Sequence, residues 1–249
     1  MRHQSSMAIA KAEVIRKLRD DILHMQGFTA PEKSSALPFG LSPIEAVFPN
    51  GIFPTGTIHE FLNTSPEHAA ASSGFLAGLL STLMQHEGAC LWISHHRTLF
   101  PTALPTFGVS PDRIIFIDLK TEKDVLWATE EALKCEGISA VIAELGSISF
   151  AQSRRLQLVV EQSKVTGFIL RKDAMKIGTT ACTARWQVTP LPTEPEYELP
   201  GLGHPRWKVE LLKVRNGHTG SWILEWGAEG FQFISPQGNE LSEHNRKTG

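Results

Sequence analysis

The chain has 249 residues, of which 41% are hydrophobic and 20% are charged. This composition is typical of a soluble globular protein, and the length suits one large domain or one domain with a small appendage. The formal net charge of −2 excludes a fold that binds nucleic acid through its overall charge, although it permits a local basic patch. No apolar run reaches the length of a membrane span, and MRHQSSMAIAKAE lacks the apolar core of a secretory signal.

The three cysteines, Cys90, Cys135 and Cys182, are scattered along the chain and odd in number. Such cysteines do not form a disulfide framework, and they indicate a reducing compartment. We therefore expect a cytoplasmic protein that is not associated with a membrane.

The first predicted element is an amphipathic helix in AIAKAEVIRKLRDDILHMQGF. Its apolar residues recur at helical spacing, at Ile15, Leu18, Ile22 and Met25. The next stretch, TAPEKSSALPFG, has the composition of a linker. Residues 1–40 are therefore expected to form an appendage, whose apolar stripe either packs on the chain's own core or docks on a partner protein.

From residue 41 onward, short apolar strands alternate with helices. The predicted strands are TIHEFL, ACLWIS, RIIFIDL, SAVIAEL and GFILR. The predicted helices are LSPIEAVFP, AASSGFLAGLLSTLMQHEG, a proline-broken TLFPTALPTFG, EKDVLWATEEALKCEG and FAQSRRLQLVVEQSK. This alternation predicts an α/β fold with a mostly parallel sheet that is flanked by helices on both faces.

The pattern changes after GFILR. RWQVTP predicts a strand, RWKVELLKVR and SWILEW predict a hairpin around the Asn-Gly turn of NGHTG, and FQFI predicts one more strand. We therefore expect antiparallel strands at the C-terminal side of a core that spans residues 41–234. The polar residues 235–249 are expected to be a disordered tail.

The stretch LNTSPEHAAASSGFLAGLL leads from a predicted strand into a predicted helix, as a phosphate-binding loop does. Such a loop needs small residues whose N–H groups surround the phosphates, a Lys at the helix start, and a Ser or Thr that holds Mg²⁺. Ser72, Ser73 and Gly74 are expected to form a small-residue turn, but Phe75 and Leu76 follow in place of the Lys and the Ser or Thr. The sequence therefore favours the remnant of a nucleotide site over a working ATP site.

Other polar residues stand at the predicted strand ends, where α/β proteins carry their sites. Glu144 lies near the end of SAVIAEL, and His95 and His96 follow ACLWIS. A carboxylate there can hold Mg²⁺ through water. In a nucleotide site the Mg²⁺ accompanies a bound triphosphate, and the sequence offers no anchor for one. Adjacent histidines rarely point at one ion, and no metal-ligand spacing accompanies them. We therefore expect no catalytic residue, no metal and no bound cofactor.

Basic residues follow the strand GFILR. Arg171, Lys172 and Lys176 are predicted to lie on a mobile loop, where they are candidates for contact with the phosphates of single-stranded DNA. A solvated surface loop is the alternative, because Asp173 offsets part of the positive charge.

The order of these motifs resembles the core of the RecA recombinases. It is more similar to the ImuA family, the RecA-like accessory proteins of bacterial mutagenic translesion synthesis. The stretches that carry the resemblance are KAEVIRKLRDDILHMQGF, LPFGLSPIEAVFPNG, FPTGTIHEF, SRRLQLVVEQSKVTGFILR, TARWQVTPLP and GHPRWKVELLKVRNGHTGSWILEW. The resemblance spans about residues 8–234.

The resemblance to the recombinases implies positions for several residues. Phe75 and Leu76 take the places of the P-loop Lys and Thr. His96 takes the place of the Glu that activates the attacking water, and Glu144 replaces the Asp of the second nucleotide motif. Residues 171–183 fall where the recombinases have a mobile DNA-binding loop, which is shortened here. The resemblance therefore implies a RecA-like scaffold without ATP turnover.

The resemblance also implies a non-catalytic role in the SOS response to DNA damage. The implied partners are an ImuB-like Y-family protein that lacks catalysis, an error-prone C-family polymerase, and RecA or single-stranded DNA. The N-terminal helix and the hairpin of residues 207–226 are the expected partner surfaces, although at least half of the hairpin tryptophans are expected to belong to the core.

Two other functions stay open at this point. The first is a DNA-dependent ATPase of the recombinase kind, against which the missing P-loop Lys argues. If the Phe75→Lys variant binds ATP and the wild type does not, the interpretation as a degenerate nucleotide site is favoured. The second is a SulA-like inhibitor of cell division that binds the tubulin-like FtsZ, although such a protein would be shorter and would not need the N-terminal helix or the C-terminal strands.

Overall fold

The computed structural model describes Val14, Lys17, Leu18 and residues 37–85, 88–97, 99–172, 177–194 and 203–234. The chain divides into two compact units, Met1–Ala36 and Leu37–Gly249. In the first unit the described residues are helical, in agreement with the predicted amphipathic helix. Three residues of its predicted apolar stripe, Ile15, Ile22 and Met25, lie outside the described part of the chain. The expected tail of residues 235–249 also lies outside it.

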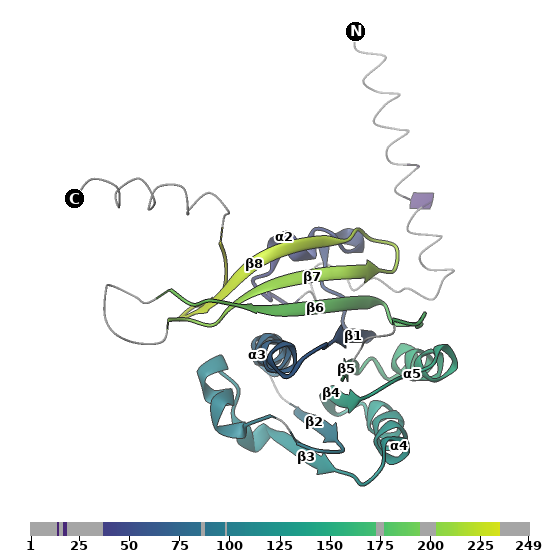
Figure 1. Ribbon diagram of the computed structural model, residues 1–249. Coiled ribbons are helices and arrows are strands. Elements are labelled where there is room, and N and C mark those ends of the chain that lie inside the picture. Colours follow the sequence, from purple (N-terminus) through teal and green to yellow (C-terminus); the bar gives the residue numbers. More distant parts are fainter. Residues whose placement is uncertain are drawn as a thin grey trace, which may run out of the picture. The chain divides into compact units, whose positions relative to one another are not determined.

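The described residues of the second unit form one sheet of nine strands with helices beside it (Figure 1). The strands are β1 (Ile58–Leu62), β2 (Ala89–Ser94), β3 (Ile114–Asp118), β4 (Ile138–Leu145), β5 (Thr166–Arg171), β6 (Ala184–Leu191), β7 (Arg206–Val214), β8 (Gly220–Gly227) and β9 (Gly230–Phe233). The helices are α2 (Ser42–Glu45), α3 (Pro66–Leu83), α4 (Glu122–Leu133) and α5 (Phe150–Ser163), with 3-10 helices η2 (Pro49–Gly51), η3 (Pro101–Phe107) and η4 (Pro111–Arg113).

The strand order in the sheet is β3-β2-β4-β5-β1-β6-β7-β8-β9. Every pair from β3 to β6 is parallel, and the pairs β6–β7, β7–β8 and β8–β9 are antiparallel. The predicted α/β fold, with a mostly parallel sheet and antiparallel C-terminal strands, is therefore confirmed. Because the parallel strands all run the same way, their carboxyl ends share one edge of the sheet, where α/β proteins place their sites.

The three long helices begin at capping residues that the sequence supplies. Ser65, Thr121 and Ser149 each accept a hydrogen bond from the backbone N–H three residues later, at α3, α4 and α5 respectively. At α5 the Gln152 side chain also accepts from the Ser149 N–H, which completes a capping box. These caps satisfy N–H groups that a helix start otherwise leaves without a partner.

Two apolar clusters cover the two faces of the sheet. One contains buried residues of α2, α3 and the segment around η3, together with strand residues such as Phe61 and Trp92. The other contains buried residues of α4 and α5 with strand residues such as Ile58 and Val141. Among the described helices, none combines the length and the apolar character that crossing a bilayer requires.

The antiparallel strands curve over α3, which lies between them and the parallel half of the sheet (Figure 1). The two approach closely at Gly78 of α3, where an added Cβ would lie 2.5 Å from Cζ of Phe231 and 2.8 Å from Cζ3 of Trp226. Contacts this short do not occur in folded proteins, so only glycine fits at this position unless the rings move. This close packing places α3 directly against β8 and β9.

Candidate functional site

The connection between β1 and α3 lies where a phosphate-binding loop would lie. β1 ends at Leu62, and α3 begins at Pro66 directly after its N-cap residue. The connection therefore consists of Asn63, Thr64 and Ser65. A connection of this length turns the chain into the helix and has no spare residues to surround a di- or triphosphate with N–H groups.

The predicted turn at residues 72–74 is wrong, because these residues lie inside α3. A Ser N-cap and a Pro in the first turn start the helix eight positions before Gly74, and the alanines that follow have the highest helix propensity. Ser72 Oγ donates to Asn63 Oδ1 at 2.7 Å, and Ser73 Oγ donates to the carbonyl of Ala69 at 2.8 Å. Both hydroxyl groups therefore form hydrogen bonds within α3 or between α3 and its connection to β1.

Phe75 and Leu76 are fully buried, so the positions assigned to the P-loop Lys and Thr belong to the core. The Phe75 ring has four aromatic neighbours with centroid distances between 5.2 and 6.4 Å: Phe61, Trp186, Trp207 and Phe231. A cationic side chain at this place would point into an apolar cluster and away from any phosphate.

Beside α3 lies an open groove of about 730 Å³. Its walls are small residues of α3, apolar residues around η3, and the ends of β6 and β7. The charged residues among its described lining are Glu67 and Arg206, and Arg206 is paired with Glu194 and Glu225 at 2.8 Å each. Among its described lining residues, the groove therefore offers no uncommitted cation to a triphosphate.

Glu144 is buried near the end of β4 and meets partners from two neighbouring strands. Nε1 of Trp92 on β2 donates to Glu144 Oε1 at 2.7 Å. Nζ of Lys172, the residue after β5, lies 2.7 Å from Glu144 Oε2 and also donates to the carbonyl oxygen of His96 at 3.4 Å. The side chain of Glu144 is 2% exposed and that of Lys172 is 33% exposed, so the ion pair is partly shielded from solvent.

The ammonium group of Lys172 changes what the Glu144 carboxylate can do. In P-loop NTPases the acidic residue of the second nucleotide motif holds Mg²⁺. Here an ammonium group already neutralises the carboxylate at hydrogen-bond distance, and a divalent cation would have to displace it. In the part of the chain that the structure describes, no group of three or more His, Cys, Asp or Glu side chains is placed to hold a metal ion. The arrangement is that of a structural ion pair.

His95 and His96 follow β2 at the same edge, and both are exposed. Nδ1 of His95 lies 2.9 Å from the carbonyl oxygen of Leu119, and the two imidazole centroids are 4.0 Å apart. His96 contributes its carbonyl oxygen to Lys172. The predicted edge position of both histidines is therefore confirmed, and His96 contacts Lys172 of the ion pair through its backbone carbonyl oxygen.

A buried ion cluster around Glu60 was not predicted from the sequence. Glu60 lies on β1, and its carboxylate accepts from Arg171 Nη1 at 3.1 Å, from Arg185 Nε at 2.7 Å and from Thr180 Oγ1 at 2.8 Å. Arg185 Nη2 also donates to the carbonyl of Gly178 at 2.7 Å. The cluster ties the segment before β6 to β1 and β5. The signal for it was a carboxylate inside the apolar strand TIHEFL, since a buried carboxylate needs a cation.

The cluster corrects the predicted basic loop. Arg171 is the last residue of β5 and is buried against Glu60, so the expectation that it lies on a mobile surface loop is wrong. Lys172 is held by Glu144. Lys176 lies outside the described residues, and its contact with DNA stays a prediction.

The hairpin of β7 and β8 packs its tryptophans inward. Trp207 is 4% exposed. The Trp226 ring is partly buried, with centroid distances of 5.5 Å to Phe107 and 4.9 Å to Phe231, and its Nε1 donates to the carbonyl of Thr106 at 2.9 Å. These contacts confirm that the tryptophans at the two ends of the expected partner surface belong to the core.

No family model matches the chain. The chain is 30% identical over 226 residues to Protein ImuA of Caulobacter vibrioides, in two strains, and the match covers 84% of this chain and 91% of that protein. The chain belongs to the ImuA family. A crystal structure of the RadB recombinase has a similar fold, with a TM-score of 0.54 at 13% identity over 80% of this chain and 100% of that one.

This ImuA-family chain combines a recombinase-like sheet with an ion pair between two of its own side chains at the carboxyl edge. Glu144 lies at that edge, as predicted, and carries Lys172 as its ion-pair partner. Ser72, Ser73 and Gly74, which were grouped with it as the remnant of a nucleotide site, lie in α3 instead. The RecA-like scaffold of the family is present, and the loop expected between β1 and α3 is replaced by a helix start.

Proposed function

We propose that this protein is a non-catalytic, RecA-like adaptor of error-prone translesion DNA synthesis in the SOS response, and that it acts in the cytoplasm. Membership of the ImuA family supports the pathway. The ion pair of Lys172 with Glu144 is the observation that carries the non-catalytic part, because it places a protein cation on the carboxylate that an ATPase would use for Mg²⁺.

Two further features support a role without ATP turnover. The connection of residues 63–65 is short and leads straight into α3. Phe75 is enclosed by aromatic rings where a P-loop Lys was assigned. Titration calorimetry of the purified protein with Mg²⁺-ATP tests this part of the proposal. No heat of binding is expected, and tight Mg²⁺-ATP binding by the wild-type chain would refute it.

The partners that we propose are an ImuB-like Y-family protein, an error-prone C-family polymerase and RecA. The N-terminal unit offers a contact surface for one of them. Val14 and Leu18 are 58% and 55% exposed and stand four positions apart in a helix, so they share one face. An exposed apolar stripe of this kind is typical of a helix that lies in a groove of another protein.

The experiment is affinity purification of the tagged full-length chain from DNA-damaged host cells, with mass spectrometry of the bound proteins. We expect an inactive Y-family polymerase and a C-family polymerase in the eluate. Recovery of FtsZ, or of no replication protein, would overturn the proposal. Because the adaptor role needs no ATP, the same partners should be recovered from lysates depleted of nucleotide.

A pair of substitutions tests the docking arm. Leu18→Asp is expected to abolish recovery of one partner at an unchanged melting temperature, because it puts a charge into the apolar stripe. Lys17→Asp introduces the same residue one position earlier, on another face of the helix, and should leave recovery intact. If Leu18→Asp instead lowers the melting temperature, the helix packs on its own core and the arm is not a docking surface.

A further inference from the structure

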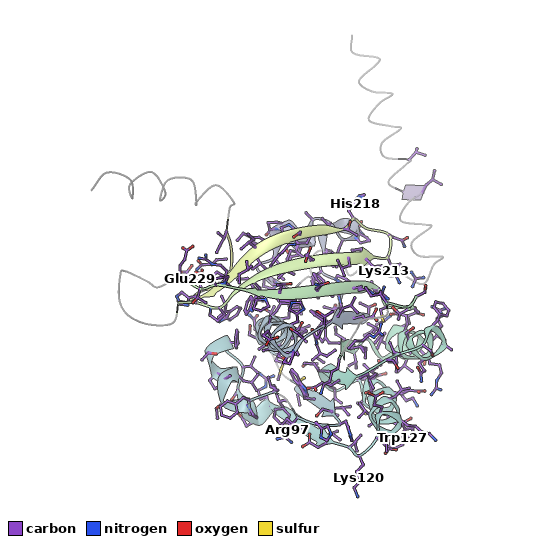
Figure 2. All side chains as sticks on the ribbon, in the orientation of Figure 1. Arg97, Lys120, Trp127, Lys213, His218 and Glu229 are labelled. Carbon is purple, nitrogen blue, oxygen red and sulfur yellow. The ribbon has the colours of Figure 1, made fainter. Side chains whose placement is uncertain are left out.

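A second pocket, of about 420 Å³, lies between α5, the segment before β6 and the end of β7. We call it the α5–β7 pocket. The described residues that line it are Phe150, Arg154, Ala181, Cys182, Lys213 and Arg215. Three of these six are cationic and none is acidic, in a chain whose net charge is −2. Figure 2 shows Lys213 at the end of the antiparallel strands that also carries His218.

Hydrogen bonds between distant segments hold the walls of the pocket in place. The N–H of Ala181 donates to Ser153 Oγ on α5 at 2.9 Å. Lys213 Nζ donates to the carbonyl of Thr180 at 2.6 Å, and the N–H of Arg215 donates to the carbonyl of Thr183 at 2.8 Å. The segment of residues 180–183 is therefore fastened to α5 on one side and to β7 on the other. The backbone around the pocket is therefore held in place, which lowers the entropy cost of binding.

The electrostatics of the pocket favour an anion. Burial is the main cause that lowers the pKa of Lys213, and the charge of Arg185 lowers it further, while the charge of Glu60 acts in the opposite direction. Burial, followed by the charge of Glu60, raises the pKa of the Cys182 thiol to about 12, so the thiol stays neutral and adds no negative charge. Arg154 lies 3.9 Å from Glu161 in a long, exposed ion pair, which is a weak one. Its guanidinium group can turn to a phosphate at little cost.

Phe150 adds an aromatic face to these cations. It is the first residue of α5 and is 55% exposed, so its ring is open to a ligand beside the cations. An aromatic ring beside Lys and Arg is the combination that single-stranded nucleic acids use, since bases stack on the ring while the phosphates meet the cations. In a duplex the bases are already stacked on one another, so their faces are not available to a protein ring.

We propose that the α5–β7 pocket binds single-stranded nucleic acid, with backbone phosphates on its three cations and a base on the ring of Phe150. Arg171 and Lys172 are not among the described residues that line this pocket. The inference goes beyond the adaptor function and does not depend on it. An acidic peptide is the competing ligand, but it would use the cations and leave the exposed ring without a partner.

The test is fluorescence anisotropy of a labelled oligothymidylate with the purified full-length chain. Phe150→Ala is expected to weaken binding about tenfold. The double substitution Arg154→Gln with Lys213→Gln should weaken binding by roughly tenfold or more and reduce the slope of log K against log salt by about 1.4, for two lost phosphate contacts. The matched control is Arg155→Gln, because Arg155 is the next residue of α5, is paired with Glu130 and lies outside the pocket. It should leave affinity unchanged.

Several results would overturn the inference. They are no binding of the oligothymidylate at low salt, equal binding by wild type and Phe150→Ala, and competition by polyglutamate that is as effective as competition by unlabelled oligothymidylate. Phe150 and Arg154 are exposed, so their substitutions test the pocket without unfolding it. The result for the double variant is interpreted only if its melting temperature is unchanged, because Lys213 also donates a hydrogen bond to the carbonyl of Thr180. The experiment uses the purified chain alone, so a negative result would not bear on the proposed polymerase partners.

Discussion

The Nζ atom of Lys172 lies 2.7 Å from Oε2 of Glu144, where the carboxyl ends of β5 and β4 lie side by side. Oε1 of the same carboxylate accepts a hydrogen bond from the indole of Trp92 on β2. The three side chains join neighbouring parallel strands at the edge that carries the nucleotide in working recombinase-like enzymes. At this edge the chain has an internal ion pair, and its contribution to stability can be measured.

The substitution Lys172→Met is expected to lower the free energy of unfolding by about 1–3 kcal/mol, because it leaves the buried Glu144 carboxylate without its cation. The value lies below that for a fully buried pair, since Lys172 is partly exposed. Urea denaturation measures it. In the double variant with Glu144→Gln, the carboxylate is gone, so the second substitution should recover part of the loss. Simple additivity of the two single effects would contradict the ion pair.

The substitution Phe75→Lys is expected to unfold the protein and not to create ATP affinity. It replaces a fully buried ring among aromatic neighbours by a charge, at a cost of roughly 4 kcal/mol or more. Far-ultraviolet circular dichroism and thermal melting measure the effect. Phe75→Leu is the control and should cost about 1–2 kcal/mol. A folded Phe75→Lys variant that binds Mg²⁺-ATP would show that α3 can give way to a phosphate loop.

The stability of the fold should fall as the pH drops from 6.5 towards 4, because His59 is buried in its neutral form. Trp186 Nε1 donates to Nδ1 of His59 at 3.2 Å, so the ring proton lies on Nε2 and points at the carbonyl of Pro54 at 2.8 Å. Burial lowers the pKa of His59 from 6.5 to about 4. Between these values the unfolded chain binds more protons, and the free energy of unfolding decreases by roughly 3 kcal/mol.

Urea denaturation at a series of pH values measures this dependence. His59→Gln should be less stable at neutral pH but should lose most of the change between pH 6.5 and 4, because it has no ring to protonate. His218→Gln, at an exposed position, should keep the slope of the wild type. An unchanged slope in His59→Gln would assign the pH dependence to other groups.

Gly78→Ala is expected to destabilise the fold by about 1–3 kcal/mol, although alanine is the better helix former by about 1 kcal/mol. The added methyl group would press on Phe231 and Trp226 and push the antiparallel strands away from α3. Gly137→Ala is the control, because no atom lies within 4 Å of its added Cβ. Thermal melting of both variants checks the prediction, and equal melting temperatures would show that the strands over α3 yield freely.

Local signals in the sequence were enough to predict most of the fold. Alternating apolar strands and helices predicted the parallel sheet, and the Asn-Gly turn predicted the antiparallel hairpin, since both depend on residues close together in the chain. The position of Glu144 at the carboxyl edge followed from its place at the end of a strand. The start of α3 was misplaced, because the pattern of a phosphate loop was given more weight than the Ser-Pro helix start at residues 65–66.

The layers, the sheet and the edge at which polar residues gather could be predicted from the sequence, because they follow from the periodicity of the residues and the direction of the chain. The partners of those residues became known only from the folded structure. Glu60 and Glu144 meet cations from other strands, and the α5–β7 pocket joins a helix to a strand that follows it much later in the chain. Such contacts depend on which strands become neighbours in the sheet, and no local pattern of residues specifies them.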